Sequence, residues 1–125
     1  MAAGALEDYI NLPDSHFSWK RLQQEKEQWG TLTRLVLVSQ RWRDYRWHHR
    51  LIIARPREVR NPGMALVWVT GDGDGGKHIK RLKALAQRAS AVTAVLTQIP
   101  NQPLYGGRRE DALIALIVVA YFGAL

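Results

Sequence analysis

The sequence predicts an α/β fold: a mixed β-sheet in which antiparallel strands come first and a β-α-β-α order follows. Three observations predict it. Short segments rich in β-branched and aromatic residues, separated by turn residues, fill the first half of the chain. A glycine-rich loop, Gly71–Gly76, then joins an apolar run to a segment with helical periodicity. A second apolar run and an apolar helix follow, and strands joined through a crossover helix are parallel.

The first half of the chain is predicted to form one helical turn and three strands. The helical turn is expected over Glu7–Asn11, and the polar residues 23–30 are expected to form a turn. The three strands are expected over residues 16–24, Thr31–Gln40 and Trp47–Ala54.

The second half supplies the β-α-β-α part. Met64–Thr70 has the length and apolarity of a strand covered on both faces. Apolar residues fall at helical spacing from Ile79 to Ala89. Ser90–Ile99 is predicted to be a second buried strand, Asn101–Gly107 a loop, and the chain from Arg109 onward a second helix.

Composition excludes some classes of protein. At 125 residues the chain is one domain or a piece of one. It has no cysteine, which excludes disulfides and thiolate metal sites. The net charge is +7, and the basic residues cluster in Arg41–Arg60 and Lys77–Arg88. A small basic protein that binds nucleic acid or anionic membrane surfaces is therefore the alternative function, although no motif for specific nucleic-acid recognition is present.

The two ends of the sequence carry no membrane or export signal that we recognise. The first 14 residues lack the cationic and apolar regions of a signal peptide. Ala112–Leu125 is uncharged, but its 14 residues fall short of the roughly 20 that span a bilayer. We expect a buried helix there and no transmembrane segment.

The glycine loop could bind a phosphate, a metal ion or an oxyanion, or be a structural turn without a ligand, and spacing removes the first two interpretations. Gly71–Gly76 (GDGDGG) matches neither of the nucleotide-binding glycine patterns. Asp72 and Asp74 resemble the start of a calcium loop, but the twelfth position is Lys83 where a bidentate glutamate is needed. We expect no cofactor and no metal. The third interpretation is a loop that donates backbone N–H groups to an oxyanion, as glycine runs after a strand do.

Six pieces of the sequence, in order, are similar to one family. The chain resembles the PhoPQ-activated pathogenicity-related proteins, whose fold is α/β-hydrolase-like, over about residues 5–115. Characteristic pieces are Ser-Gln-x-Trp, Trp-x-His-x-Leu, a glycine-rich loop and Asn-Gln-Pro-Leu. The resembling segments are residues 5–20, 38–42, 47–56, 64–76, 99–104 and 109–115.

The resemblance implies the N-terminal half of an α/β-hydrolase fold, with the chain stopping before the nucleophile elbow. Residues 1–125 would then be a partial domain that is catalytically inactive alone, with ester or peptide substrates belonging to full-length relatives. The oxyanion-type loop would be Gly71, Asp72, Gly73, Asp74, Gly75 and Gly76, and Asn101 and Gln102 would be loop contacts. The resemblance also implies export of the bacterial relatives and a link to virulence regulation.

The residues themselves argue against catalysis in this chain. There is no G-x-S-x-G, and the serines lack the strand-to-helix elbow that exposes a nucleophile. A carboxylate about 4 Å from a developing oxyanion would cost roughly 1 to 4 kcal/mol. Asp74 has a structural role available as a cap for the following helix. His48 and His49 are adjacent in a strand, so they face opposite sides and do not form a metal site together.

Overall fold

The computed structural model describes residues 4–99, 102–109, 111–112 and 115–116. Its elements are α1 (Ala5–Asn11), β1 (Ser18–Lys26), β2 (Gly30–Trp42), β3 (Tyr45–Pro56), β4 (Ala65–Val69), the 3-10 turn η1 (Gly76–His78), α2 (Ile79–Ala89) and β5 (Val92–Thr97).

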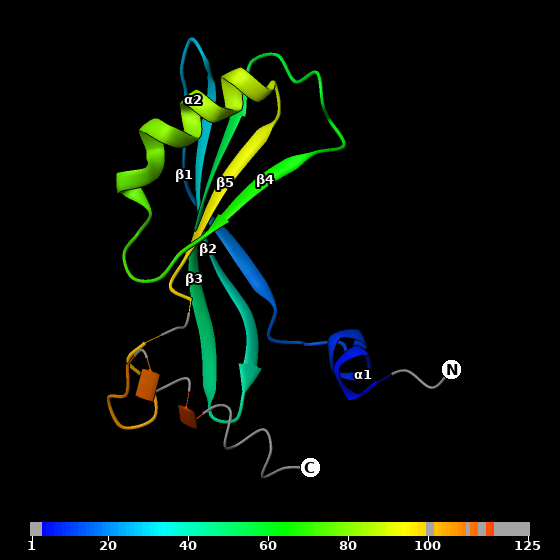
Figure 1. Cartoon of the computed structure of the whole chain (residues 1–125), viewed down its shortest axis with the longest axis vertical. Coiled ribbons are helices and arrows are strands. Elements are labelled where there is room, and N and C mark those ends of the chain that lie inside the picture. Colours follow the sequence, from blue (N-terminus) through cyan, green and yellow to red (C-terminus); the bar gives the residue numbers. More distant parts are fainter. Residues whose placement is uncertain (1–3, 100–101, 110, 113–114, 117–125) are drawn as a thin grey trace.

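The five strands form one mixed sheet in the order β1-β2-β3-β5-β4. The pairs β1–β2, β2–β3 and β3–β5 are antiparallel, whereas β4 and β5 run parallel and are joined through α2. The predicted parallel crossover is therefore confirmed. Figure 1 shows α2 lying over the sheet and the hairpin of β2 and β3 extending well beyond the helix.

The predicted α/β class is wrong. The described chain is mostly β, with only two short helices, and it is not the β-α-β-α arrangement of an α/β hydrolase. The single crossover helix suggested the α/β class, but the hairpin of β2 and β3 contributes more to the fold. That hairpin is built from strands of 13 and 12 residues, β2 and β3, so β structure dominates. The helix predicted from Arg109 falls largely outside the described residues, and so does most of the apolar segment 112–125.

Two further local predictions change. Strand β1 continues to Lys26, so the turn expected over residues 23–30 is confined to the short connection between β1 and β2. Strand β4 is the edge of the sheet, and Leu66, Val67 and Val69 are about half exposed rather than covered on both faces. Strand β5, by contrast, is buried as predicted.

The core lies between α2 and one face of the sheet. Leu82 and Ala86 of α2 pack against Ile52, Ala54 and Val95, all at most 3% exposed. The hydroxyl of Thr93 donates to the Leu82 carbonyl at 2.9 Å, which satisfies a buried polar group and fixes α2 on β5. The end of β5 borders this core, and so do the loops that follow β4 and β5.

The opposite face of the sheet is apolar but open. Leu35, Leu51 and Leu96 are register partners across three strands and are only partly buried. A hollow of about 450 Å³ lies there beside Trp19, whose side chain is exposed. Within the described residues, no helix is long and apolar enough to cross a membrane.

Candidate functional site

The glycine loop folds back onto the end of β5. The Gly71 carbonyl accepts the backbone N–H of Gln98 at 2.7 Å. The Gly73 carbonyl accepts the hydroxyl of Thr97 at 2.8 Å. Two of the loop's carbonyl groups are thus fixed by the strand it packs on, and the loop takes its shape from β5.

Gly75 is the position at which glycine is required. Its φ is +84°, a conformation that other residues rarely adopt. A Cβ there would lie 3.0 Å from Val95 Cγ1 and 3.2 Å from both Ile52 Cδ1 and Thr97 Cγ2. The glycine therefore lets the loop pack directly on the core.

The two loop aspartates have different surroundings. Asp74 Oδ1 accepts the backbone N–H of Gly76 at 2.8 Å, at the start of η1. The predicted capping role is correct only in this limited sense, because the cap residues of η1 and α2 are Gly75 and His78, without side-chain cap bonds. Asp72 is exposed and lies 3.4 Å from the Arg109 guanidinium. The oxyanion role of Gly71–Gly76 stays a prediction.

The loop after β5 reaches the tip of the β2–β3 hairpin. Asn101, one of the two predicted loop contacts, lies outside the described residues, and Gln102 precedes a cis peptide bond to Pro103. Farther on, the Tyr105 ring lies 4.5 Å from Tyr45 and packs edge-on against Trp42, with ring centroids 5.9 Å apart. Aromatic packing therefore holds this loop on the hairpin.

A polar junction that the sequence did not predict lies between these two loops. Ser39 Oγ is 2.8 Å from His49 Nε2, and His49 Nδ1 is 3.0 Å from the Gln98 carbonyl oxygen. Ser39 sits at a β-bulge, because the register of β2 against β3 shifts between Val38 and Gln40. Bulges redirect a side chain, and this one brings Ser39 to the buried imidazole. We call this set Ser39, His49 and Gln98 the polar junction.

The hydrogen bonds fix the tautomer of His49. A carbonyl oxygen only accepts, so Nδ1–H donates to Gln98 and the unprotonated Nε2 accepts the Ser39 hydroxyl. The imidazole is only 4% exposed, and this burial lowers its pKa below the ordinary value of 6.5, although the Gln98 carbonyl acts in the opposite direction. His48 is exposed, so the predicted opposite orientation of the two histidines is confirmed.

The junction and the glycine loop form one continuous set of contacts. Gln98 accepts from His49 through its carbonyl and donates to Gly71 through its N–H. Gln98 itself has a φ of +65°, which costs backbone energy in a non-glycine residue. Two of the family-like pieces, Ser-Gln-x-Trp and Trp-x-His-x-Leu, thus meet through Ser39 and His49. Both pieces place polar residues in neighbouring strands, and this was the signal that the sequence offered for the contact. The contact between Ser39 and His49 itself becomes evident only from the β-bulge.

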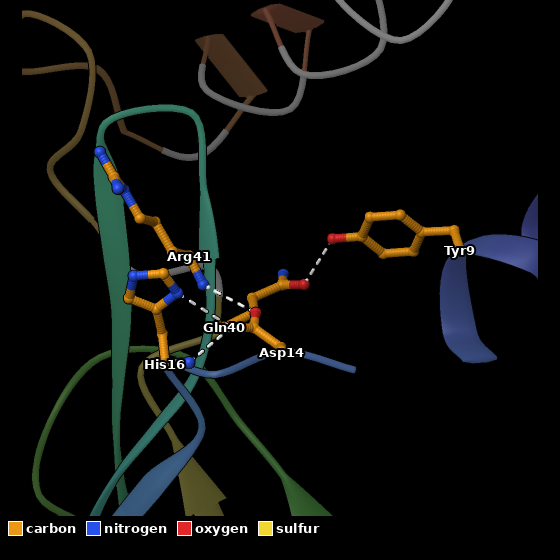
Figure 2. A network of polar contacts seen from close by, with 5 residues as sticks. All are labelled: Tyr9, Asp14, His16, Gln40 and Arg41. Atoms are coloured by element: carbon orange, nitrogen blue, oxygen red, sulfur yellow. Dashed lines mark hydrogen bonds and ion pairs between the residues drawn. The ribbon is translucent and has the colours of Figure 1, made fainter. Parts of the chain in front are cut away.

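A hollow of about 620 Å³ opens beside Ser39, between α1, residues 12–16 and the end of β2. Figure 2 shows the polar contacts at its wall, in which Tyr9 of α1 reaches Gln40 at 2.7 Å. Asp14 accepts the backbone N–H groups of His16 and Arg41 at 2.8 and 3.0 Å. The backbone N–H of His16 is the main reason that the pKa of Asp14 lies below its ordinary value. These bonds attach the N-terminal segment to β2.

The chemistry available to the junction is limited. Ser39 and His49 meet the distance expected of a nucleophile and its base. However, the group that orients the imidazole is a carbonyl rather than a carboxylate, and burial opposes formation of an imidazolium ion. Among the described residues there is no group of three or more metal-ligating side chains.

Comparison with known proteins gives two findings. The family model described as PhoPQ-activated pathogenicity-related protein matches residues 6–124. Autocrine proliferation repressor protein A of Dictyostelium discoideum is 28% identical over 124 residues, which are 88% of this chain and 25% of that protein. The chain thus spans about a quarter of the length of the curated relative it matches. No solved structure matches the chain.

Proposed function

We propose, from the premise that the chain belongs to the PhoPQ-activated pathogenicity-related protein family, that residues 4–109 act as a scaffold without hydrolytic activity of their own. The scaffold positions two loops at the end of the sheet where β4 and β5 finish: Gly71–Gly76, and the loop after β5, of which residues 98–99 and 102–105 are described. Ester or peptide hydrolysis, if longer members carry it out, would depend on groups outside this chain.

One observation carries the proposal: the polar junction joins both loops to the β2–β3 hairpin. Gln98 is the shared residue, bonded to His49 on one side and to Gly71 on the other. Buried polar groups whose hydrogen bonds are all made restrict a structure to one arrangement. A junction of this kind suits a positioning role.

The electrostatics of the junction support the absence of turnover. A general base must accept a proton as the nucleophile attacks, so His49 would become an imidazolium in the transition state. In serine hydrolases a buried carboxylate stabilises that cation. Here neutral backbone groups at Gln98 and Thr97 take the place of that carboxylate, and desolvation, the largest effect on the His49 pKa, disfavours the charged ring. The carboxylates of Asp72 and Asp74 in the neighbouring loop would further oppose a developing oxyanion.

Hydrolysis of p-nitrophenyl acetate and of a dipeptide anilide by the purified chain tests the proposal. We expect the rate to equal that of buffer, and the Ser39→Ala variant to behave identically. Circular dichroism of both proteins confirms that folded protein is compared. Turnover by the wild-type chain that Ser39→Ala abolishes would overturn the proposal, because it would make Ser39 a nucleophile.

A further inference from the structure

The outer surface of η1 and α2 carries four cations. Six of the exposed residues fall on one helical face, which we call the α2 stripe. Its members are Lys77, Lys80, Arg81, Ala84, Gln87 and Arg88. No acidic residue occurs between Lys77 and Arg88, so no carboxylate interrupts the row.

Among the described residues, no carboxylate is paired with a cation of the stripe. Lys83, the remaining cation of the segment, faces another way: its Nζ lies 2.6 Å from Glu27 and 5.3 Å from the Trp29 ring centroid. Arg81 is held in place, since its guanidinium stacks 4.9 Å from the centre of the Trp68 ring.

We propose that the α2 stripe binds the phosphate backbone of a nucleic-acid duplex without reading its sequence. This interaction goes beyond the scaffold role and does not depend on it. Four cations are spread along about 16 Å of helix, at a rise of about 1.5 Å per residue. Their density of one cation per about 4 Å of helix is close to the roughly 3.4 Å of axis that separates successive phosphates along one strand of a duplex.

The chemistry of the stripe argues for a duplex over the other polyanions. Ala84 is its only apolar member, so nothing anchors it among lipid chains as an interfacial helix requires. The nearby aromatic ring, Trp68, is already covered by Arg81 and lies 5.1 Å from His78, which leaves no free platform for stacking unpaired bases. Gln87 is the only neutral polar member, too little to read base edges.

Fluorescence anisotropy of a labelled DNA duplex, measured between about 50 and 200 mM salt, tests the proposal. Four phosphate contacts give a slope of log K against log salt of about −3.6, which is about a 150-fold loss of affinity over this range. The paired substitution Lys80→Gln with Arg88→Gln should reduce the magnitude of the slope by about 1.8 and the affinity at low salt by more than about tenfold.

A matched control separates the stripe from net charge. Arg41→Gln with Arg46→Gln removes the same charge from two exposed, paired positions near the tip of the β2–β3 hairpin, which extends well beyond α2 (Figure 1). We expect this control to weaken binding by less than about threefold, because exposed charges far from the contact are screened. An equal loss in both pairs would overturn the proposal. So would the absence of binding at low salt, tighter binding to a single strand of the same length, or tighter binding to phosphatidylserine vesicles at equal phosphate concentration.

Discussion

The glycine loop and the polar junction lie side by side, yet they are built in opposite ways. The loop is one continuous run, Gly71–Gly76, whose shape depends on backbone freedom at Gly75. The junction is assembled from three strands or strand ends, and its His49 and Gln98 are 49 positions apart in sequence. The loop carries exposed carboxylates, whereas the junction joins a buried neutral imidazole to two partly buried groups through hydrogen bonds.

This difference shows that the glycine run, although conspicuous in the sequence, does not by itself determine the structure of the site. The glycine run is easy to notice in sequence, but its carbonyls at Gly71 and Gly73 are bound by Gln98 and Thr97. The conformation of the loop therefore depends on the end of β5, and the polar junction fixes that end at Gln98. The inconspicuous serine and histidine therefore position the conspicuous loop, and substitutions in the two regions should differ in size and in character.

The largest effect should come from Gly75→Ala. The added methyl group meets Val95, Ile52 and Thr97 at 3.0–3.2 Å, and the positive φ is unfavourable for alanine. We expect a loss of about 2–5 kcal/mol in the free energy of unfolding, from backbone strain and overpacking together. Urea denaturation measures it, with Gly73→Ala as the control for packing, since Gly73 also has a positive φ (+104°) but a Cβ there meets nothing within 4 Å. An equal loss at both glycines would contradict the packing explanation.

The junction should respond next. His49→Leu removes the partner of the Ser39 hydroxyl and of the Gln98 carbonyl, both partly buried, at a cost of about 1–2 kcal/mol. Ser39→Ala removes one hydrogen bond and should cost about 1 kcal/mol. The double variant should cost less than the sum of the two, because both changes break the same bond. Strict additivity in chemical denaturation would show that Ser39 and His49 do not interact.

The pH dependence of stability isolates His49. Burial lowers its pKa in the folded state, so below pH 6.5 the unfolded chain binds the proton more readily. Stability that is fully present above pH 6.5 should thus be lost as the pH falls toward the folded-state pKa, by at most about 1.4 kcal/mol per pH unit. Wild type and His49→Leu compared by urea denaturation from pH 7.5 to 5 should differ in this slope. A parallel decline in both would exclude His49 as its source.

The smallest effects should come from the loop carboxylates. Asp74→Ala removes the acceptor of the Gly76 N–H and should cost about 0.5–1 kcal/mol. Asp72→Ala removes only an exposed contact with Arg109 and should change the free energy of unfolding by less than about 0.5 kcal/mol. Thermal melts of the two variants give the comparison. If Asp72→Ala proved the more destabilising, the assignment of a structural role to Asp74 would be wrong.

Much of the local structure could be predicted from the sequence, because it depends on periodicity. The alternation of β2 and β3 and the helical spacing of Leu82 and Ala86 in α2 indicate their elements directly. The parallel pairing of β4 and β5 follows from the crossover between them. These features depend on neighbouring residues, which a single sequence contains.

The fold class and the junction could not be predicted, because they depend on register and strand order. Nothing local indicates that β5 inserts between β3 and β4, and that insertion brings Gln98 to His49. The bulge at Ser39 is an irregularity of one residue in the pairing of two long strands. The extent of those strands also determined the class, and it was underestimated where polar residues such as Arg41 and Arg46 continue the strands.

Amide hydrogen exchange at Gln98 tests the central claim that the polar junction holds the loops in place. The Gln98 N–H donates to Gly71, so its protection reports the contact between the loop and the end of β5. We predict that His49→Leu speeds exchange at Gln98 by at least about tenfold relative to the buried amide of Val95 in the same protein. Equal acceleration at Gln98 and Val95, or none at Gln98, would contradict the account.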